Sequence, residues 1–580
     1  MKLLHSVLCS GLFLATVFVP VQVSAQTLAF PTAEGFGKYA TGGRGGEVVE
    51  VTNLDDSGEG SLRWALSQYP TTPFTVVFRV SGVIKLSSDI RCNRNGLTIA
   101  GQTAPGDGIC IRGAKLNFGG SKNLVIRHIR SRIGGKTDEG VFIPGGSIDI
   151  ENASDFIIDH CTFGWSAEEN MTIYDNKRTT IQWCLVHEGL YTSGHAKGER
   201  SYASQWGGQF STYHHNLLAH NNNRTPRFNG ARGSNDVRVL TDYVNNVNYN
   251  WGKPNSCYGG DINNNTYNHI NMVGNYYKPG PARPIGNQSY FVQASYGGTL
   301  KVSNWYLSGN VMEGNADMTA DNNTGVDLSP NPATSRDTMI VSTPFFITPV
   351  YSVNTETAQK AYESVLAGAG AFPRDVVDLR VIDETRNGTA SGKGTVEKYP
   401  SSISGTDTTW VSNHYYGLQL GIIDTPSAVG GYPSYNTSNT ITDNDHDGMD
   451  DAWEIANGFD PTNKDDRNVR MLSGYTALEV YLNSLVNESI PLEIDHTGIS
   501  NQFVSDKISV YPNPAVDKLY IGTEHRLVSG DIFGADGSLI KKVIFNDVAI
   551  ADVADLHSGN YILVLTTADK QKATVRFLKK

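Results

Sequence analysis

Cysteine is scarce in this chain. Six cysteines occur among 580 residues, and no two of them form the CxxC pair that is typical of zinc sites and thiol–disulfide enzymes. Five remain once the N-terminal segment with Cys9 is set aside, and an odd number excludes a complete disulfide framework. We expect buried thiols that pack as small hydrophobic side chains, at Cys92, Cys110, Cys161, Cys184 and Cys257.

Long hydrophobic runs and excess positive charge are also missing. Residues 1–25 are interpreted as a secretory signal peptide, and after them no run is apolar and long enough to span a membrane. Lys and Arg number 47 against 58 Asp and Glu, a formal net charge of −11. Such a chain does not favour nucleic acid, and an acidic ligand would require a local basic patch. We expect a secreted or cell-surface monomer that is exported through the periplasm.

Short segments with alternating apolar residues recur between residues 120 and 320, among them "LVIRHIRSR", "FIIDHCTFGW", "TTIQWCLVHE" and "INMVGNYYKPG". Strands that cannot bury a face alone can do so when they stack as coils, so the repeat predicts an all-β parallel β-helix. When the segments are aligned, one column reads Ile129, Cys161, Cys184, Asn216, Asn246, Asn275 and Asn310. Inward Asn amides at this column would bond to one another along the axis; unrelated Asn-rich turns are the alternative.

Charge gathers in three stretches on consecutive coils. Because equivalent sides of successive coils lie ~5 Å apart, these stretches predict one groove with acids on one rung and cations on the next. They are "WSAEENMTIYD" with Glu168 and Glu169, "HEGLYTSGHAKGERSYASQWGG" with His195, Lys197 and Arg200, and "NNNRTPRFNGAR" with Arg224, Arg227 and Arg232.

The motifs "IIDHCTFGW", "HHNLLAH" and "NRTPRF", with "LTIAGQTAPGDGICI" before them, resemble the pectate lyases of polysaccharide lyase family 1. The resemblance runs from about residue 28 to residue 435. It implies a right-handed parallel β-helix that cleaves polygalacturonate by calcium-assisted β-elimination and releases 4,5-unsaturated oligogalacturonates.

The resemblance also implies roles for single residues. By position, Arg224 corresponds to the arginine that removes the C5 proton. An arginine base requires a lowered pKa, and one neighbouring cation at contact distance is worth ~4 kcal/mol, or ~3 pK units. The remaining assignments are Lys197 and Arg227 as further catalytic cations, His195, Arg200 and Arg232 as substrate contacts, and Glu168, Glu169 and Asp149 as Ca²⁺ ligands.

Three positions depart from the family pattern. Asn229 stands where a second arginine is usual, Ser147 where an aspartate is common, and Thr172 where a second acidic Ca²⁺ ligand is expected. The Ca²⁺ site in the groove is therefore expected to be weaker or to require the carboxylates of the substrate.

A second Ca²⁺ site is predicted by "DNDHDGMDDAWE", which matches the loop pattern D-x-[DN]-x-[DN]-G-x₅-E. The sharp turn falls at Gly448, and we expect a structural rather than a regulatory ion. The expected ligands are Asp443, Asp445, Asp447, Asp451 and Glu454. An amphipathic helix in "GYTALEVYLNSLV" then closes this segment.

The C-terminal residues read as short strands with hairpin turns and predict a small β-sandwich. The segment "VYPNPAVDKLYI" and the basic end resemble the C-terminal sorting domain of the type IX secretion system of Bacteroidetes, so its secretion machinery is an expected partner. A carbohydrate-binding or adhesive module is the alternative, but most aromatic residues here fall in patterns that would bury them.

Three other functions compete with a pectate lyase. A polygalacturonase-type hydrolase needs paired carboxylates around the bond, whereas this groove is rich in cations. A pectin lyase acting on methyl-esterified pectin would replace the acids at Glu168 and Glu169, and a non-catalytic adhesin does not require Lys197, Arg224 and Arg227 together. The expected organisation is a signal peptide (1–25), the β-helix (26–435), a Ca²⁺-loop and helical closing segment (436–490), a linker (491–506) and the sorting domain (507–580).

Overall fold

The computed structural model of the chain describes residues 26–229, 238–260, 267–283, 289–294, 303–404, 407–437, 440–495, 508–523, 527–534, 538–545, 549–567 and 572–580. The expected signal peptide, Arg232 and most of the expected linker lie outside these residues. The chain divides into two compact units, Met1–Ile494 and Asp495–Lys580.

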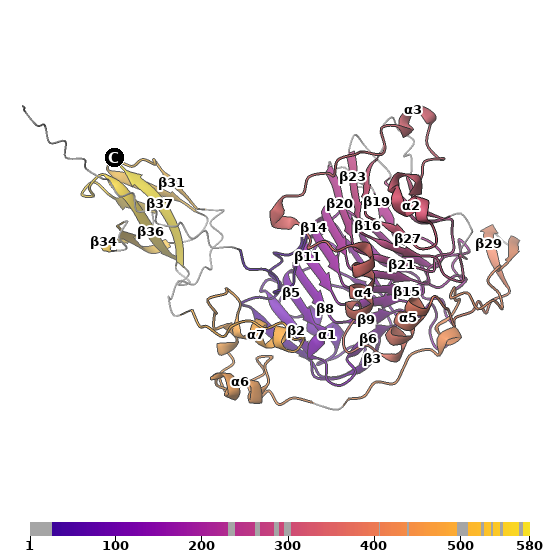
Figure 1. Cartoon of the computed structure of the whole chain (residues 1–580). Helices are drawn as coiled ribbons and strands as arrows, with labels where there is room; N and C mark the ends of the chain where they lie inside the picture. Colours follow the sequence, from indigo (N-terminus) through magenta and orange to yellow (C-terminus); the bar gives the residue numbers. More distant parts are fainter. Residues whose placement is uncertain are drawn as a thin grey trace, which may run out of the picture. The chain divides into compact units, whose positions relative to one another are not determined.

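Three parallel sheets form the larger unit, and successive strands of the chain alternate among them, which confirms the parallel β-helix (Figure 1). The first sheet contains β1 (Glu47–Val51), β2 (Phe74–Phe78), β5 (Asn95–Ala100), β8 (Lys122–Arg127), β11 (Ser154–Asp159), β14 (Lys177–Gln182), β17 (Gln209–His214), β20 (Arg238–Val244), β23 (Tyr267–Val273) and β26 (Asn304–Ser308). The second contains β3 (Gly82–Lys85), β6 (Ile109–Arg112), β9 (Arg130–Arg132), β12 (Thr162–Gly164), β15 (Leu185–His187), β18 (Leu217–Ala219), β21 (Val247–Tyr249), β24 (Tyr276–Lys278) and β27 (Val311–Met312). The third contains β4 (Ile90–Arg91), β7 (Leu116–Asn117), β10 (Ile148–Glu151), β13 (Glu169–Tyr174), β16 (Tyr202–Gly207), β19 (Arg227–Asn229), β22 (Asn255–Gly259), β25 (Tyr290–Ala294) and β28 (Val326–Asp327).

The core consists of side chains that stack in register from coil to coil. Ile126, Ile158, Ile181 and Tyr213 are Cα partners on consecutive strands of the first sheet, and all four are fully buried. Stacking places like side chains at contact distance, so each coil buries the apolar face of the next. This arrangement explains why the apolar alternation of the sequence repeats with the length of a coil.

The turn from the first sheet to the second carries the predicted asparagine ladder. On each coil one residue adopts a left-handed conformation, such as Trp183 (φ 53°) and His215 (φ 54°), and the next residue is buried in the interior. Asn216 Nδ2 donates to Asn246 Oδ1 at 2.9 Å, and the same bond continues to Asn275 (3.1 Å) and Asn310 (2.8 Å). The ladder is confirmed, and it also includes Asn322, which the sequence alignment missed.

Helices from the later part of the chain cover the outside of the coils (Figure 1). α4 (Ala358–Gly368) and α5 (Val376–Asn387) pack on the second sheet, where Val365 and Val381 share one buried cluster with Leu217 and Val247. α7 (Ala477–Ser484) packs on the first sheet through Leu478 and Tyr481. Shorter helices are α1 (Leu62–Ser67), α2 (Ala316–Ala320), α3 (Ala333–Arg336) and α6 (Asp451–Asn457), and a hairpin is formed by β29 (Lys398–Ser404) and β30 (Asp407–Ser412).

The smaller unit is the predicted β-sandwich. Two antiparallel sheets enclose one core with Leu519, Ile532 and Leu563. Most aromatic residues were expected to be buried, but Tyr511 and Tyr520 are exposed and stack with their ring centroids 5.7 Å apart. One sheet contains β31 (Ser509–Tyr511), β32 (Lys518–Gly522) and β35 (Ile550–Asp552), and the other β34 (Leu539–Ile544), β33 (Leu527–Phe533), β36 (Gly559–Thr567) and β37 (Lys572–Lys579).

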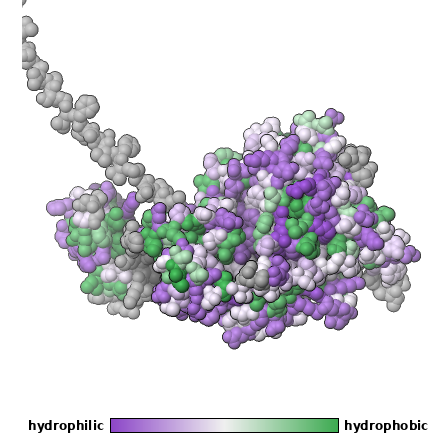
Figure 2. Space-filling view, turned by 60° about the horizontal axis from the view of Figure 1, so that its bottom comes forward, coloured by the Kyte–Doolittle hydropathy of each residue, from purple (hydrophilic) through white to green (hydrophobic). Residues whose placement is uncertain are grey.

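The five cysteines among the described residues are buried thiols, as expected. Within the described part of the chain, no helix combines the length and apolar character needed to cross a membrane. Hydrophobic and hydrophilic residues form a mosaic of separate patches on the face shown in Figure 2.

Candidate functional site

The charged stretches of three consecutive coils meet in one cleft on the third sheet. The cleft has a volume of about 310 Å³, and its acids come from the start of β13, its cations from the loops before β16 and β19. It is lined by Glu168, Glu169, Lys197, Arg200, Tyr202, Gln205, Arg224 and Arg227. The predicted groove with acids on one rung and cations on the next is therefore present.

Strand register decides which side chains share the floor of the cleft. Asp149, Thr172, Gln205 and Arg227 are Cα partners on β10, β13, β16 and β19, and Tyr258 of β22 continues the row. Each lies between two buried residues of its strand, so the row faces outward. Of this row, Gln205 and Arg227 line the cleft.

Arg224 lies across the ring of Tyr202. Its backbone is left-handed (φ 57°), its Cζ is 4.2 Å from the ring centroid, and its Nη1 forms an ion pair with Glu169 Oε1. Glu169 is the register partner of Tyr202, which is bridged to Asn223, so the Arg224 side chain spans one intervening coil. Two side chains from two coils thus fix the direction of this guanidinium.

The surroundings shift the pKa of Arg224 in the cleft and of His195 at its edge. Burial lowers the pKa of Arg224 and Arg227 lowers it further, whereas Tyr258 and Glu168 raise it. Burial also lowers the pKa of His195, while Glu168 acts in the opposite direction. Both shifts favour neutral side chains, the form that a general base requires.

A rigid support holds the loop between β15 and β16, which carries His195, Lys197 and Arg200. Glu199 accepts hydrogen bonds from the hydroxyl groups of Tyr191 (2.7 Å) and Tyr399 (2.6 Å), and Tyr399 belongs to β29. At the tip of the loop, Lys197 is exposed. His195 Nε2 contacts Glu168 Oε1, which places a seventh predicted residue at the edge of the cleft.

The predicted Ca²⁺ ligands of the cleft are each in contact with a basic side chain. Asp149 Oδ2 lies 2.6 Å from Lys115 Nζ, Glu168 contacts His195, and Glu169 contacts Arg224. Among the described residues, no group of three acidic or histidine side chains in this cleft brings its ligand atoms within 4.8 Å of one another. The oxygen donors suit Ca²⁺ chemically, but an ion needs six to eight of them, so the residues fit only if a ligand supplies the remainder.

The sequence interpretation missed Tyr202, Gln205 and Lys115. Tyr202 and Gln205 belong to β16. Gln205 is the register partner of Arg227, so an alignment of these two strands would have located it. The position of Lys115 depends on how β7 pairs with β10, which no local motif indicates. Ser147 is fully buried and bonds to Ser166 Oγ at 2.9 Å, so it does not reach the cleft.

The predicted Ca²⁺ loop forms a separate acidic cluster. Asp443, Asp445 and Asp447 place one carboxylate oxygen each within 4.8 Å of the others, and Glu454 of α6 joins Asp447 in the same way. Burial and the neighbouring carboxylates raise the pKa of Asp447 to about 7 and that of Glu454 to about 8. Asp451, in contrast, accepts a hydrogen bond from the backbone N–H of Asn444 at 2.9 Å.

The sequence is similar to those of several known proteins. The chain is 32% identical over 468 residues to a protein named probable pectate lyase C from Aspergillus terreus, covering 80% of this chain and 95% of that protein. A protein with the same name from Emericella nidulans is 31% identical over 467 residues and covers 80% and 93%.

Two further similarities concern a solved structure and the C-terminal unit. A solved pectate lyase from Bacillus sp. N165 in complex with trigalacturonate is 18% identical with a TM-score of 0.37, covering 58% of this chain and 98% of that chain. Residues 509–580 match the family described as secretion system C-terminal sorting domain.

Proposed function

The chain belongs to the pectate lyases and is a polysaccharide lyase with a type IX secretion sorting domain, and on this premise we propose that it cleaves polygalacturonate by Ca²⁺-assisted β-elimination outside the cell. The observation that carries the proposal is the cleft with Lys197, Arg200, Arg224 and Arg227, a local basic patch in a chain of net charge −11. Such a patch binds the carboxylates of an acidic polysaccharide against the field of the whole molecule.

The reaction removes the proton at C5 of a galacturonate unit. The electrons of the C5–H bond form the C4–C5 double bond, the C4–O bond to the next sugar breaks, and the departing oxygen takes up a proton. The C5 proton is acidic only because the C6 carboxylate accepts charge as the proton leaves, so cations near that carboxylate lower the barrier.

We assign the proton abstraction to Arg224. Its pKa is lowered by burial and by Arg227, and its direction is fixed by Tyr202 and Glu169. Glu169 stabilises the charged guanidinium in the free protein, so Arg224 must first lose a proton to the solvent, and its pair with Glu169 must open, before it can accept the C5 proton. Arg227 and Arg200 bind the substrate carboxylates, and Lys197 at the exposed loop tip binds the neighbouring sugar.

Glu168, Glu169 and Asp149 would hold Ca²⁺ together with substrate carboxylates, because the protein alone offers too few free oxygens. The ion would supply additional charge for the developing enolate. The sorting domain supports export through the type IX machinery after transit of the periplasm.

The experiment is ultraviolet absorbance of the unsaturated product formed from polygalacturonate, first with Ca²⁺ and then with chelator. We expect absorbance that grows with Ca²⁺ and disappears with chelator and in Arg224→Ala. New reducing ends without absorbance would show a hydrolase and contradict the proposal. Activity that is retained in chelator and prefers methyl-esterified pectin would show a pectin lyase.

A further inference from the structure

A second acidic centre lies in the segment 440–494 and shares no residue with the cleft. Asp447 belongs to two groups of three carboxylates: one with Asp443 and Asp445, the other with Glu454 and Asp466. Within each group the ligand atoms lie within 4.8 Å of one another. Asp466 begins the 3₁₀ helix η5 (Asp466–Asn468), twelve residues beyond the end of the predicted loop.

The buried carboxylates of this centre are short of partners. Glu454 is fully buried, and neither of its carboxylate oxygens has a hydrogen-bond partner. One oxygen each of Asp445, Asp447 and Asp466 is in the same state. Buried anionic oxygens without donors are strongly unfavourable, and the carboxylates of the two groups, which share Asp447, repel one another, so the arrangement requires a cation.

We infer that these five carboxylates bind one Ca²⁺ ion and that Asp466, from outside the loop, takes the place that the sequence pattern gives to Asp451. The donors are all oxygens and include a shared central carboxylate, which suits the flexible coordination of Ca²⁺ better than the octahedron of Mg²⁺. Asp451 is oriented elsewhere, because its two oxygens accept hydrogen bonds from the backbone and side-chain N–H groups of Asn444.

The ion would join two segments that both contact the first coils of the β-helix. On the loop side, Asp443 pairs with Arg79, and Arg79 Nε lies 2.6 Å from Glu50 of β1. On the Asp466 side, Arg467 Nη2 lies 2.9 Å from Glu47, also on β1. The centre therefore links the loop and the Asp466 segment to one strand, β1, which lies far from both in the sequence.

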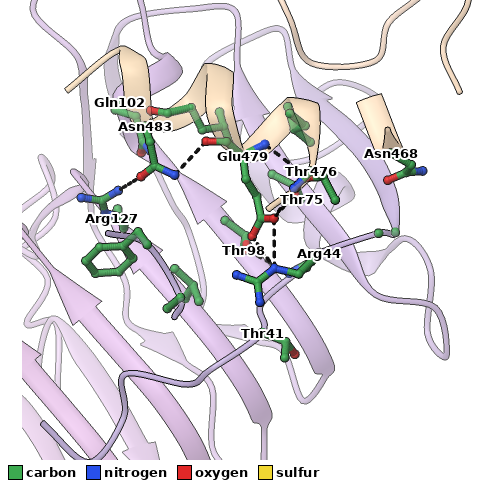
Figure 3. A pocket seen from close by; sticks show the side chains of 18 residues that line it. Thr41, Arg44, Thr75, Thr98, Gln102, Arg127, Asn468, Thr476, Glu479 and Asn483 are labelled. Atoms are coloured by element: carbon green, nitrogen blue, oxygen red, sulfur yellow. Dashed lines mark hydrogen bonds and ion pairs between the residues drawn. The ribbon is translucent and has the colours of Figure 1, made fainter. Parts of the chain in front are cut away.

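The same segment continues into α7, whose contacts with the β-helix are shown in Figure 3. Arg44 Nε lies 2.8 Å from Glu479, and Arg127 Nη1 donates to Asn483 at 2.9 Å. Because η5 is the element before α7 in the chain, ion binding at Asp466 favours the docked position of this helix. The centre thus acts as a Ca²⁺-dependent clasp that holds the closing segment on the first sheet.

The test compares Asp466→Asn with Asp451→Asn in the full chain, using Ca²⁺ titration by calorimetry. We expect Asp466→Asn to lose one tight site or weaken it at least about tenfold, and Asp451→Asn to bind as the unmodified chain does. Equal binding by Asp466→Asn, or loss in Asp451→Asn alone, would overturn the inference. The cleft is the same in all three proteins, so a weak or absent cleft site leaves the comparison unchanged.

The unmodified chain provides an independent measurement that does not depend on folding of a variant. Trp453 of α6 stacks on Phe459 at 5.7 Å and contacts Tyr481 of α7 at 5.3 Å, so its fluorescence reports the closing segment. Chelator should change this emission and expose residues 440–494 to protease, and added Ca²⁺ should reverse both effects. An emission spectrum and a digestion pattern that chelator leaves unchanged would contradict the clasp.

Discussion

Arg224 forms an ion pair with Glu169 across the ring of Tyr202. The coil that carries Tyr202 lies between the coils of the two charged residues. Glu169 is almost fully buried, with 5% of its side chain exposed, whereas 18% of the Arg224 side chain remains open to the cleft. The buried Glu169 carboxylate therefore holds one side of the guanidinium, and the exposed side of the guanidinium faces the cleft. This pair gives Glu169 a second role beside the proposed one of a metal ligand.

Glu169→Gln separates these two roles. Loss of the carboxylate removes an interaction that favours charged Arg224, so the pKa of Arg224 should fall further below its ordinary value. The acid limb of kcat/KM against pH, which reports the free enzyme, should then move to lower pH, while kcat at alkaline pH falls because the guanidinium is less well oriented. If Glu169→Gln only raises the Ca²⁺ concentration that activity requires and leaves the acid limb of the pH profile unmoved, Glu169 acts as a metal ligand alone.

Arg224→Lys should lower kcat by about 10²–10⁴-fold, the contribution of a positioned proton acceptor. Lysine cannot span the coil of Tyr202 in the same way, since it lacks the planar group that stacks there. The matched control is Arg178→Lys, because Arg178 pairs with Asp155 on the first sheet at 2.6 Å, outside the cleft. Activity of Arg224→Lys equal to that of the control would exclude Arg224 as the base.

The pH dependence of the unmodified enzyme follows from the direction of the Arg224 shift. The active form is the neutral guanidine, and burial and Arg227 lower its pKa from the ordinary value of arginine. The rate should therefore rise from neutral pH to about pH 9 and continue upward. A rate that falls over this interval in steady-state assays would contradict proton abstraction by Arg224.

Asn246→Ala should destabilise the β-helix by about 3 kcal/mol, measured by denaturant unfolding. Its carbonyl oxygen accepts from the backbone and side-chain N–H groups of Asn216, and both donors would remain buried without a partner. Asn387→Ala is the control, because Asn387 is exposed and bonds only to Asp383 within its own helix. Equal losses of unfolding free energy in the two variants would show that the ladder stabilises the fold no more than an exposed side-chain hydrogen bond does.

Acid should release α5 from the second sheet. Burial raises the pKa of Asp375, but the Arg132 charge and hydrogen bond outweigh it, so the pKa lies below its ordinary value. The pair therefore contributes stability above about pH 4 that is lost as pH falls. Asp375→Asn should be less stable by about 3–5 kcal/mol at pH 7, with a smaller loss on acidification. An unchanged pH slope of the unfolding free energy would contradict this assignment.

The sequence by itself determined the repeating coils, the asparagine column and the residue types of the cleft, because each depends on a period or a motif within one coil. Stacking in register then brings Glu168, Lys197 and Arg224 together without further information. The Ca²⁺ loop was also visible, since its first ligands lie within twelve residues.

Only the tertiary structure decided which partner each charged side chain takes. The ion pair of Glu169 with Arg224 depends on the reach of a side chain across a coil, and that of Asp149 with Lys115 depends on neighbouring strands. Asp466 joins Asp447 and Glu454 because the chain after α6 folds back, which no spacing in the loop specifies. Charges interact over distances that are short in space but long in sequence, so their pairing follows from packing rather than from pattern.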